Sequence, residues 1–120
     1  MTSGPMGELQ KRLDAGGTLL LDGATGTELQ RRGVPMDRAA WCAVATLTHG
    51  DVLRQVHEDY VRLGADIVTA NTFASARHLL ERAGQGELTV ELLRQAVRLA
   101  REAVDAAAER PVAVAGSIST

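Results

Sequence analysis

The sequence predicts an α/β protein built on a parallel sheet, and three observations support this fold class. Three short apolar runs alternate with longer amphipathic segments along the 120 residues. Each run is bounded by glycine or proline, and each ends on small or polar residues. Strands that alternate with helices in this way favour parallel pairing with right-handed crossover connections.

Composition excludes several classes of protein. The chain is 45% hydrophobic and 23% charged, as in ordinary globular proteins. It contains no apolar run of the roughly 18 residues that a membrane-spanning helix needs, and no basic leader followed by an apolar run, so we expect a cytoplasmic protein without a membrane partner. The net charge of −2 gives no reason to expect nucleic acid. One cysteine excludes an internal disulfide and cannot by itself hold a structural zinc.

The first half of the chain begins with a polar lead, expected to be frayed, and a short helix over residues 8–15. Residues 1–17 therefore form a lead that precedes the main unit, residues 18–120. An apolar run at residues 19–21 predicts a strand buried on both faces, ending at Asp22. Thr25 and Glu28 match a capping box for a short helix that ends at Gly33. Residues 34–46 have no clean period and predict a long connection.

The second half repeats the strand and helix pattern twice. A second capping signature at residues 48–51 precedes a helix with one apolar stripe, and Gly64 ends that helix. Residues 65–70 predict the second strand, residues 73–83 a helix and residues 84–86 a turn. A long amphipathic helix is predicted over residues 89–109, and the third strand over residues 112–115. The inward positions predicted for the two best helices are Val52, Leu53, Val56, Tyr60 and Leu63, and Leu92, Leu93, Ala96, Val97, Ala100, Ala103 and Val104.

The strand ends carry the candidate site. Parallel strands place their carboxyl ends along one rim, where small molecules bind in α/β proteins. That rim would bring together Asp22 with Gly23, Asn71 with Thr72, and Gly116 with Ser117. The Asp22 carboxylate suits an ammonium group, and the amides of residues 23–25 suit a carboxylate, so together they fit an amino acid.

Other interpretations of these residues remain open. Asp22 and Gly23 also form a common turn dipeptide, and Asn71 and Thr72 also suit the cap of a following helix. The glycine-rich segment 23–27 contains neither the full dinucleotide-binding fingerprint nor the lysine of a phosphate-binding loop. Phosphate binding is therefore a weak alternative to amino-acid binding. Trp41 and Ser117 are candidate pocket walls.

The histidines and the cysteine are read as structural. His57 lies beside the apolar stripe of its helix, which favours a surface or packing role, and we expect His49 and His78 at the surface. Cys42 has no basic neighbour in sequence that would activate its thiol. No catalytic residue and no metal ligand is therefore assigned within this chain.

Several separated motifs resemble the amino-terminal part of the homocysteine S-methyltransferase family. They are LLDGATGTEL at residues 20–29, Arg32 with Gly33, HEDY at 57–60, GADIV at 64–68 and NTF at 71–73. The resemblance implies a TIM barrel of which the first three of eight βα units are present. We therefore expect either a fragment of a longer protein or a chain that pairs with a second one, since three strands leave two open edges.

The resemblance also implies an activity. In this family a zinc ion held by three cysteines binds the homocysteine thiolate, which takes a methyl group from a donor and gives methionine. Asp22 and Gly23 match the positions that hold the amino-acid end of homocysteine, while Asn71 and Thr72 match a motif that shapes the pocket. The family's zinc cysteines match no position of this chain, so the chain alone is expected to be inactive. Its third strand continues into Ser119 and Thr120 where many relatives have Gly-Pro.

The resemblance leaves two alternatives. One is a non-catalytic, truncated barrel that acts as a small-molecule-binding or assembly module. The other is a different TIM-barrel enzyme that shares only the fold. The identity of the methyl donor is not encoded in these motifs.

Overall fold

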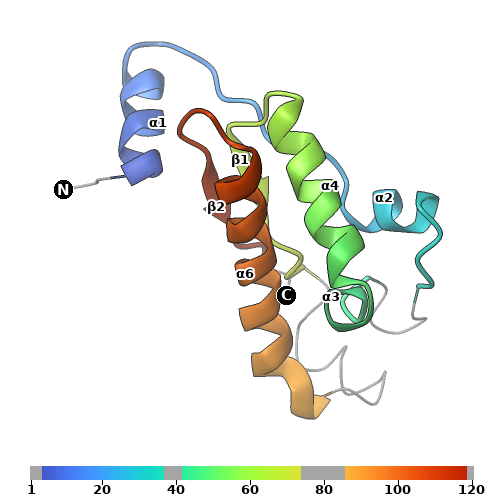
Figure 1. Cartoon of the computed structure of the whole chain (residues 1–120). Helices are drawn as coiled ribbons and strands as arrows, with labels where there is room; N and C mark the ends of the chain where they lie inside the picture. Colours follow the sequence, from blue (N-terminus) through green and yellow to red (C-terminus); the bar gives the residue numbers. More distant parts are fainter. Residues whose placement is uncertain (1–3, 37–41, 74–85, 119–120) are drawn as a thin grey trace.

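The computed structural model describes residues 4–36, 42–73 and 86–118, and its helices pack against a small parallel sheet (Figure 1). In chain order the elements are α1 (Gly4–Asp14), α2 (Gly26–Arg31), α3 (Ala45–Thr48), α4 (Gly50–Arg62), β1 (Ile67–Thr69), the 3-10 helix η1 (Gly86–Leu88), α6 (Thr89–Ala107) and β2 (Ala113–Ala115). The mixed helical and parallel architecture confirms the predicted class at this coarse level. Trp41, His78, the helix predicted at 74–83 and the turn residues 84 and 85 lie outside the described residues.

The sheet pairs β1 with β2 in parallel, with Ile67 opposite Ala113 and Thr69 opposite Ala115. The predicted first strand is reduced to a single parallel bridge between Leu21 and Ile67. The prediction that this strand is buried on both faces is wrong, because Leu20 and Leu21 are 56% and 62% exposed. Helices α4 and α6 pack against β1 and β2, and they leave this segment near the edge of the packed layers.

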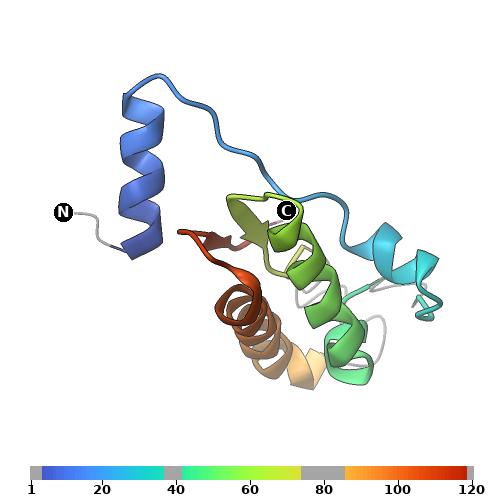
Figure 2. The ribbon, with the colours of Figure 1, turned by 45° about the horizontal axis from the view of Figure 1, so that its top comes forward.

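Helices α4 and α6 lie side by side on one face of the sheet (Figures 1 and 2). Gly64, with a φ of +113°, ends the turn after α4 as predicted, because only glycine adopts that conformation without strain. On the predicted stripe of α4, Leu53 and Val56 are fully buried, but Leu63 follows the helix and is 78% exposed. The stripe missed Val61, which is buried.

Helix α6 begins at the predicted residue and ends two residues earlier than predicted, ahead of Pro111. Its buried face consists of Leu92, Ala96, Leu99, Ala100 and Ala103. Small alanine side chains on this face let the helix approach its neighbours closely. Leu93 was predicted inward and lies outward, whereas Leu99 was missed.

Tyr60 of α4 joins two clusters of buried side chains, because its ring packs against both. One cluster lies between α4, α6 and the segment after α2, and includes Leu29, Leu53 and Leu92. The other lies between α6 and the sheet and includes Val68. Aliphatic side chains therefore build most of the core, as the low aromatic content predicts.

Both predicted capping boxes are wrong. The Thr25 side chain makes no capping hydrogen bond, and the Glu28 carboxylate instead accepts hydrogen bonds from Arg31 and Arg32. Helix α4 begins at Gly50, and its N-cap residue is His49, which makes no side-chain capping bond. The Thr48 hydroxyl instead donates to the Val44 carbonyl of the preceding turn. The Glu28 and Thr48 side chains, which the capping boxes need, thus form hydrogen bonds with other groups instead.

Helix α1 begins at Gly4, so most of the lead that we predicted to be frayed is helical, and Leu9 is buried. The helix stands to one side of the sheet, at the end of an extended connection (Figures 1 and 2). Arg12 ties it to the sheet by donating to the buried Asp66 carboxylate at 2.8 Å and to the Thr18 carbonyl at 2.9 Å. The proposed boundary between residues 1–17 and 18–120 stays a prediction.

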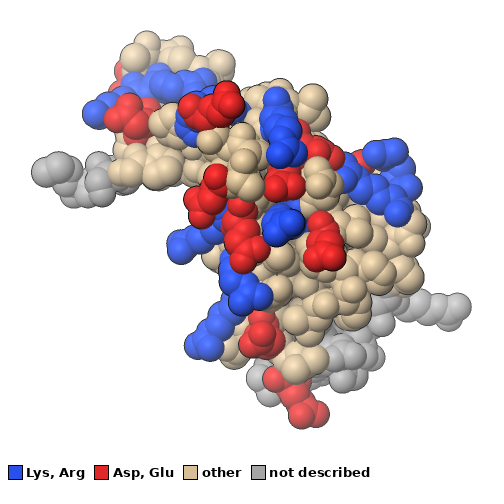
Figure 3. Space-filling model, viewed as in Figure 1, with Lys and Arg blue, Asp and Glu red and all other residues tan. Residues whose placement is uncertain are grey.

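The surface over α4 and α6 carries both signs of charge. Blue and red side chains are interspersed across the face shown in Figure 3. Among the described residues, no helix has the length and apolar character needed to cross a membrane.

Candidate functional site

A hollow of about 360 Å³ lies at the carboxyl ends of the strands. Its walls come from three strand ends that are distant in sequence, as the parallel topology predicts, and from Cys42. The lining residues are Leu21, Asp22, Gly23, Ala24, Thr25, Gly26, Cys42, Thr69, Ala70, Asn71, Phe73 and Ser117. Of the residues predicted from the sequence, Thr72 lies just outside this lining and Trp41 lies outside the described residues.

The Asp22 carboxylate is held on the wall of this hollow by one residue of β1. The Thr69 backbone N–H donates to Asp22 Oδ2 at 2.8 Å, and the Thr69 hydroxyl donates to Oδ1 at 3.0 Å. Burial raises the pKa of Asp22 above its ordinary range, and the Thr69 hydrogen bonds oppose that rise. Sequence reasoning missed Thr69, which stood two residues before the predicted polar end of the strand.

The turn after Asp22 rests on the aromatic ring of Tyr60. The Tyr60 hydroxyl donates to the Ala24 carbonyl at 2.8 Å. A Cβ added to Gly23 would lie 2.8 Å from that hydroxyl oxygen and 3.0 Å from Cε1 and Cζ of the ring. Gly23 is therefore needed for close packing on Tyr60. The sequence placed Tyr60 on the inward stripe of its helix but gave no sign that it reaches the turn.

Asn71 ties the second strand to the segment that begins at Cys42. Its buried side-chain Nδ2 donates to the Cys42 carbonyl and to the Thr46 hydroxyl, each at 3.0 Å. Its Oδ1 accepts from the Cys42 thiol at 3.2 Å. Burial raises the pKa of Cys42, which keeps the thiol protonated and supports the structural role predicted for it.

Thr72 connects the rims of β1 and β2. Its hydroxyl donates to the Ser117 carbonyl at 2.7 Å and accepts from the Ser117 N–H at 2.8 Å. The three strand ends that the sequence pointed to therefore lie together. The Asp22 carboxylate accepts hydrogen bonds from Thr69 of β1. Thr72, which follows β1, is hydrogen-bonded to Ser117, which follows β2.

Comparison with known proteins identifies the family. The family model for homocysteine S-methyltransferases matches residues 19–120. The chain belongs to the homocysteine S-methyltransferase family. It is 37% identical over 116 residues to a homocysteine S-methyltransferase of Escherichia coli, covering 92% of this chain and 37% of that protein. It is 39% identical over 92 residues to a selenocysteine methyltransferase of Astragalus bisulcatus, covering 76% of this chain and 27% of that protein.

Solved structures support the same family. The metallated form of the homocysteine methyltransferase MmuM from Escherichia coli superposes with a TM-score of 0.79 at 29% identity. That match covers 97% of this chain and 41% of MmuM. The oxidized form gives a TM-score of 0.81 at 30% identity. The chain thus spans 27% to 41% of the length of these relatives.

The residues of this family member do not fit a three-cysteine zinc site. The sequence contains a single cysteine, and the described residues contain no cluster of three or more His, Cys, Asp or Glu side chains placed to hold a metal. The Cys42 thiol is buried and hydrogen-bonded to Asn71.

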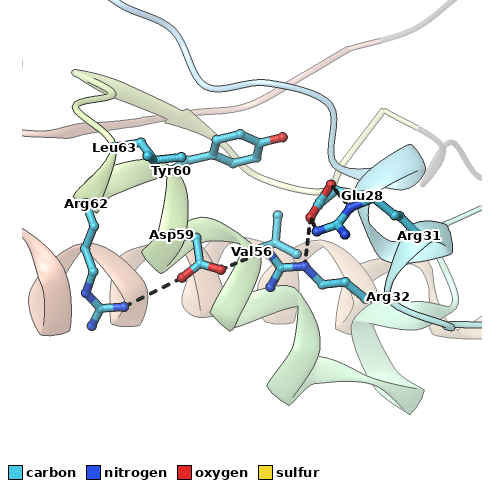
Figure 4. Close-up of a pocket in the computed structure, with 8 residues that line it drawn as sticks. All are labelled: Glu28, Arg31, Arg32, Val56, Asp59, Tyr60, Arg62 and Leu63. Atoms are coloured by element: carbon cyan, nitrogen blue, oxygen red, sulfur yellow. Dashed lines mark hydrogen bonds and ion pairs between the residues drawn. The ribbon is translucent and has the colours of Figure 1, made fainter.

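A second hollow lies between α2 and α4 (Figure 4). Acidic and basic side chains alternate along it. Glu28 pairs with Arg31 and Arg32, and Asp59 pairs with Arg32 and Arg62. Hydrogen bonds from Arg31 and then Arg32 lower the pKa of Glu28 to about 2. Each of these charged side chains has a partner of opposite sign, with three arginines facing two carboxylates, and the network joins α2 to α4.

His57 is fully buried on α4. This agrees with a packing role and excludes the surface alternative. Among the described residues, neither of its ring nitrogens has a hydrogen-bond partner. His49, which was predicted at the surface, is partly exposed and contacts the Thr48 hydroxyl at 2.8 Å.

Proposed function

We propose that the rim hollow binds the amino-acid end of L-homocysteine, and that this chain contributes the amino-acid clamp of a homocysteine S-methyltransferase. The observation that carries the proposal is the Asp22 carboxylate, fixed on the wall of the hollow at the end of the sheet. Methyl transfer from a sulfonium or other methyl donor to the substrate thiolate is proposed from family membership. We also propose from family membership a zinc ion, a cytoplasmic location, a place in methionine biosynthesis and a TIM barrel to which these βα units would belong.

The carboxylate retains capacity for a ligand. Its two oxygens offer about four lone-pair positions, and the Thr69 bonds use two of them. A substrate ammonium group would take the remaining positions in a charge-assisted hydrogen bond. Because burial raises the pKa of Asp22, we expect binding to weaken as the pH falls and the carboxylate takes up a proton.

The turn beside Asp22 offers donors for the substrate carboxylate. Among the described residues, none accepts a hydrogen bond from the backbone N–H groups of Gly23 or Thr25. Both residues line the hollow. Opposite ends of an amino acid would thus meet a carboxylate and backbone amides within one hollow. We propose Asn71, Thr72 and Ser117 as residues that shape this hollow and hold its walls.

Calorimetric titration with L-homocysteine tests the proposal. Asp22→Asn keeps the shape of the side chain and removes its charge, and we expect about 10- to 100-fold weaker binding from the loss of a charged hydrogen bond. Asp105→Asn, an exposed acid on α6, is the matched control and should bind as the wild type does. 4-Sulfanylbutanoic acid, which lacks the ammonium group, should bind the wild type no better than it binds Asp22→Asn.

A non-catalytic assembly module is the alternative, and the exposure of the first strand favours it. Leu20 and Leu21 are more than half exposed beside the bridge to β1. An apolar strand edge of this kind is a template for pairing. Light scattering coupled to size exclusion would support this module if it gave a stable dimer that failed to bind homocysteine.

A further inference from the structure

Thr69 replaces a backbone hydrogen bond of the sheet with a side-chain one. The Ile67 N–H donates to the Leu20 carbonyl at 3.4 Å, and the Asp22 N–H donates to the Ile67 carbonyl at 3.0 Å, as in a parallel ladder. The next bond of such a ladder would run from the Thr69 N–H to the Asp22 carbonyl. Instead, the Thr69 N–H donates to the Asp22 carboxylate.

The Thr69 hydroxyl completes a two-point hold on the carboxylate. It donates to Oδ1, while the backbone N–H of the same residue donates to Oδ2, so both oxygens are fixed from one side. The register of β1 with β2 fixes the backbone of Thr69, because it pairs with Ala115. A β-branched side chain has few χ1 rotamers, so its hydroxyl is held in place at little entropic cost.

We propose that Thr69 is a positioning residue for substrate binding, one that orients the Asp22 carboxylate toward the hollow. This inference rests on the proposed function, since it assigns the carboxylate to the ammonium group of the substrate. The free oxygen positions of Asp22 face the hollow only while Thr69 occupies the others. Without the hydroxyl, one of the hydrogen bonds that oppose the effect of burial on the Asp22 pKa is lost, so the carboxylate takes up a proton at a higher pH, and the protonated form binds an ammonium group poorly.

Two variants separate the hydroxyl from the shape of the side chain. Thr69→Val removes the hydroxyl and keeps the branched shape, while Thr69→Ser keeps the hydroxyl. The first measurement is an NMR titration of the Asp22 carboxyl carbon in the ligand-free protein. We expect Asp22 to titrate at a higher pH in Thr69→Val than in the wild type, and near the wild-type pH in Thr69→Ser.

The second measurement is the pH dependence of L-homocysteine affinity in the same variants. Thr69→Val should bind about 3- to 10-fold more weakly near neutral pH, with the acid side of its profile moved to higher pH. Thr69→Ser should restore most of that loss. A merely structural role for Thr69 would lower stability without moving the pH profile.

The outcomes separate this inference from the proposed function. Unchanged Asp22 titration in Thr69→Val overturns the positioning role, whatever the ligand does. If the Asp22 titration shifts in Thr69→Val but the wild-type protein binds no homocysteine, the control of Asp22 by Thr69 stands and the assigned substrate is overturned. Thr69→Ala, which also lacks the hydroxyl, repeats both measurements should Thr69→Val unfold.

Discussion

At the scale of single residues, the contact between Gly23 and Tyr60 explains why the turn after Asp22 has its observed position. The ring lies where a side chain on Gly23 would have to be, and its hydroxyl bonds to the next carbonyl. Helix α4 thus supports the wall of the rim hollow from behind. The Tyr60 ring occupies the space that a side chain at position 23 would need.

Gly23→Ala is expected to destabilise the protein by about 1–3 kcal/mol, the usual cost of inserting a methyl group into a packed site. The added Cβ would lie 2.8 Å from the Tyr60 hydroxyl oxygen, so the ring or the turn must move. Gly116→Ala is the matched control, because nothing lies within 4 Å of its Cβ. Urea unfolding measures both variants, and equal midpoints would contradict the close contact.

His57 gives a pH dependence of stability whose sign follows from its burial. Burial lowers its pKa in the folded protein to about 4, against about 6.5 in the unfolded chain. The neutral form is therefore favoured by folding. This contribution is complete above pH 6.5 and is lost as the pH falls toward 4.

We expect the free energy of unfolding to fall by about 2 kcal/mol between pH 7 and pH 5 because of His57. Over this range Asp59 and Asp66 contribute little, since interactions in the folded protein lower their pKa values further from it. His57→Leu, which cannot take up a proton, should remove most of the dependence. Urea unfolding at both pH values is the measurement, and the same slope in the variant would refute this role.

At the scale of elements, Asp66 joins three segments at the start of β1. Its carboxylate accepts from Arg12 of α1 and from the Leu20 N–H at 2.8 Å, and these bonds, that to Leu20 foremost, lower its pKa. Asp22 and Asp66 thus stand at opposite ends of the same short sheet. Asp66 connects structural elements, while Asp22 faces the hollow.

Arg12→Ala is expected to cost about 1–2 kcal/mol of stability, because it takes a charged hydrogen-bond partner from a buried carboxylate. Lys11→Ala removes the neighbouring charge, whose pairing with Glu8 at 3.5 Å is largely exposed, and should change stability by less than about 0.5 kcal/mol. Hydrogen exchange should also show faster opening of α1 in Arg12→Ala. Equal exchange in the two variants would mean that Arg12 does not hold the helix.

The elements also show which parts of the fold can be read from sequence. Helices α4 and α6 were predicted because their apolar periodicity is strong and glycine or proline marks their ends. The capping boxes were wrong because spacing cannot reveal that Arg31 and Arg32 compete for Glu28. The first strand was predicted too long and too buried, because an apolar run alone does not show which other elements of the fold will pack against it.

At the scale of the whole molecule, parallel topology made the position of the site predictable. Asp22, Asn71 and Ser117 come from three separate strand ends and line one hollow. The residues that hold them could not be predicted, because Thr69, Tyr60 and Thr46 act through contacts between segments distant in sequence. Membership of the homocysteine S-methyltransferase family gives these contacts a proposed purpose.

The rim hollow and the hollow between α2 and α4 differ in their chemistry. In the hollow of Figure 4 each charged side chain has a partner of opposite sign, whereas the rim hollow presents the Asp22 carboxylate and the backbone amides of Gly23 and Thr25, which have no acceptor among the described residues. An amino acid should therefore bind at the rim. Binding of the amino acid at the rim hollow is the central claim.

The most direct test is to map backbone amide chemical shifts of the isotope-labelled chain during titration with L-homocysteine. Binding at the rim should give perturbations concentrated at residues 22–26, 69–71 and 116–117, and Asp22→Asn should abolish them. Perturbations concentrated at Glu28, Arg32 and Asp59, or none at saturating ligand, would contradict the claim that the rim of the sheet is an amino-acid clamp.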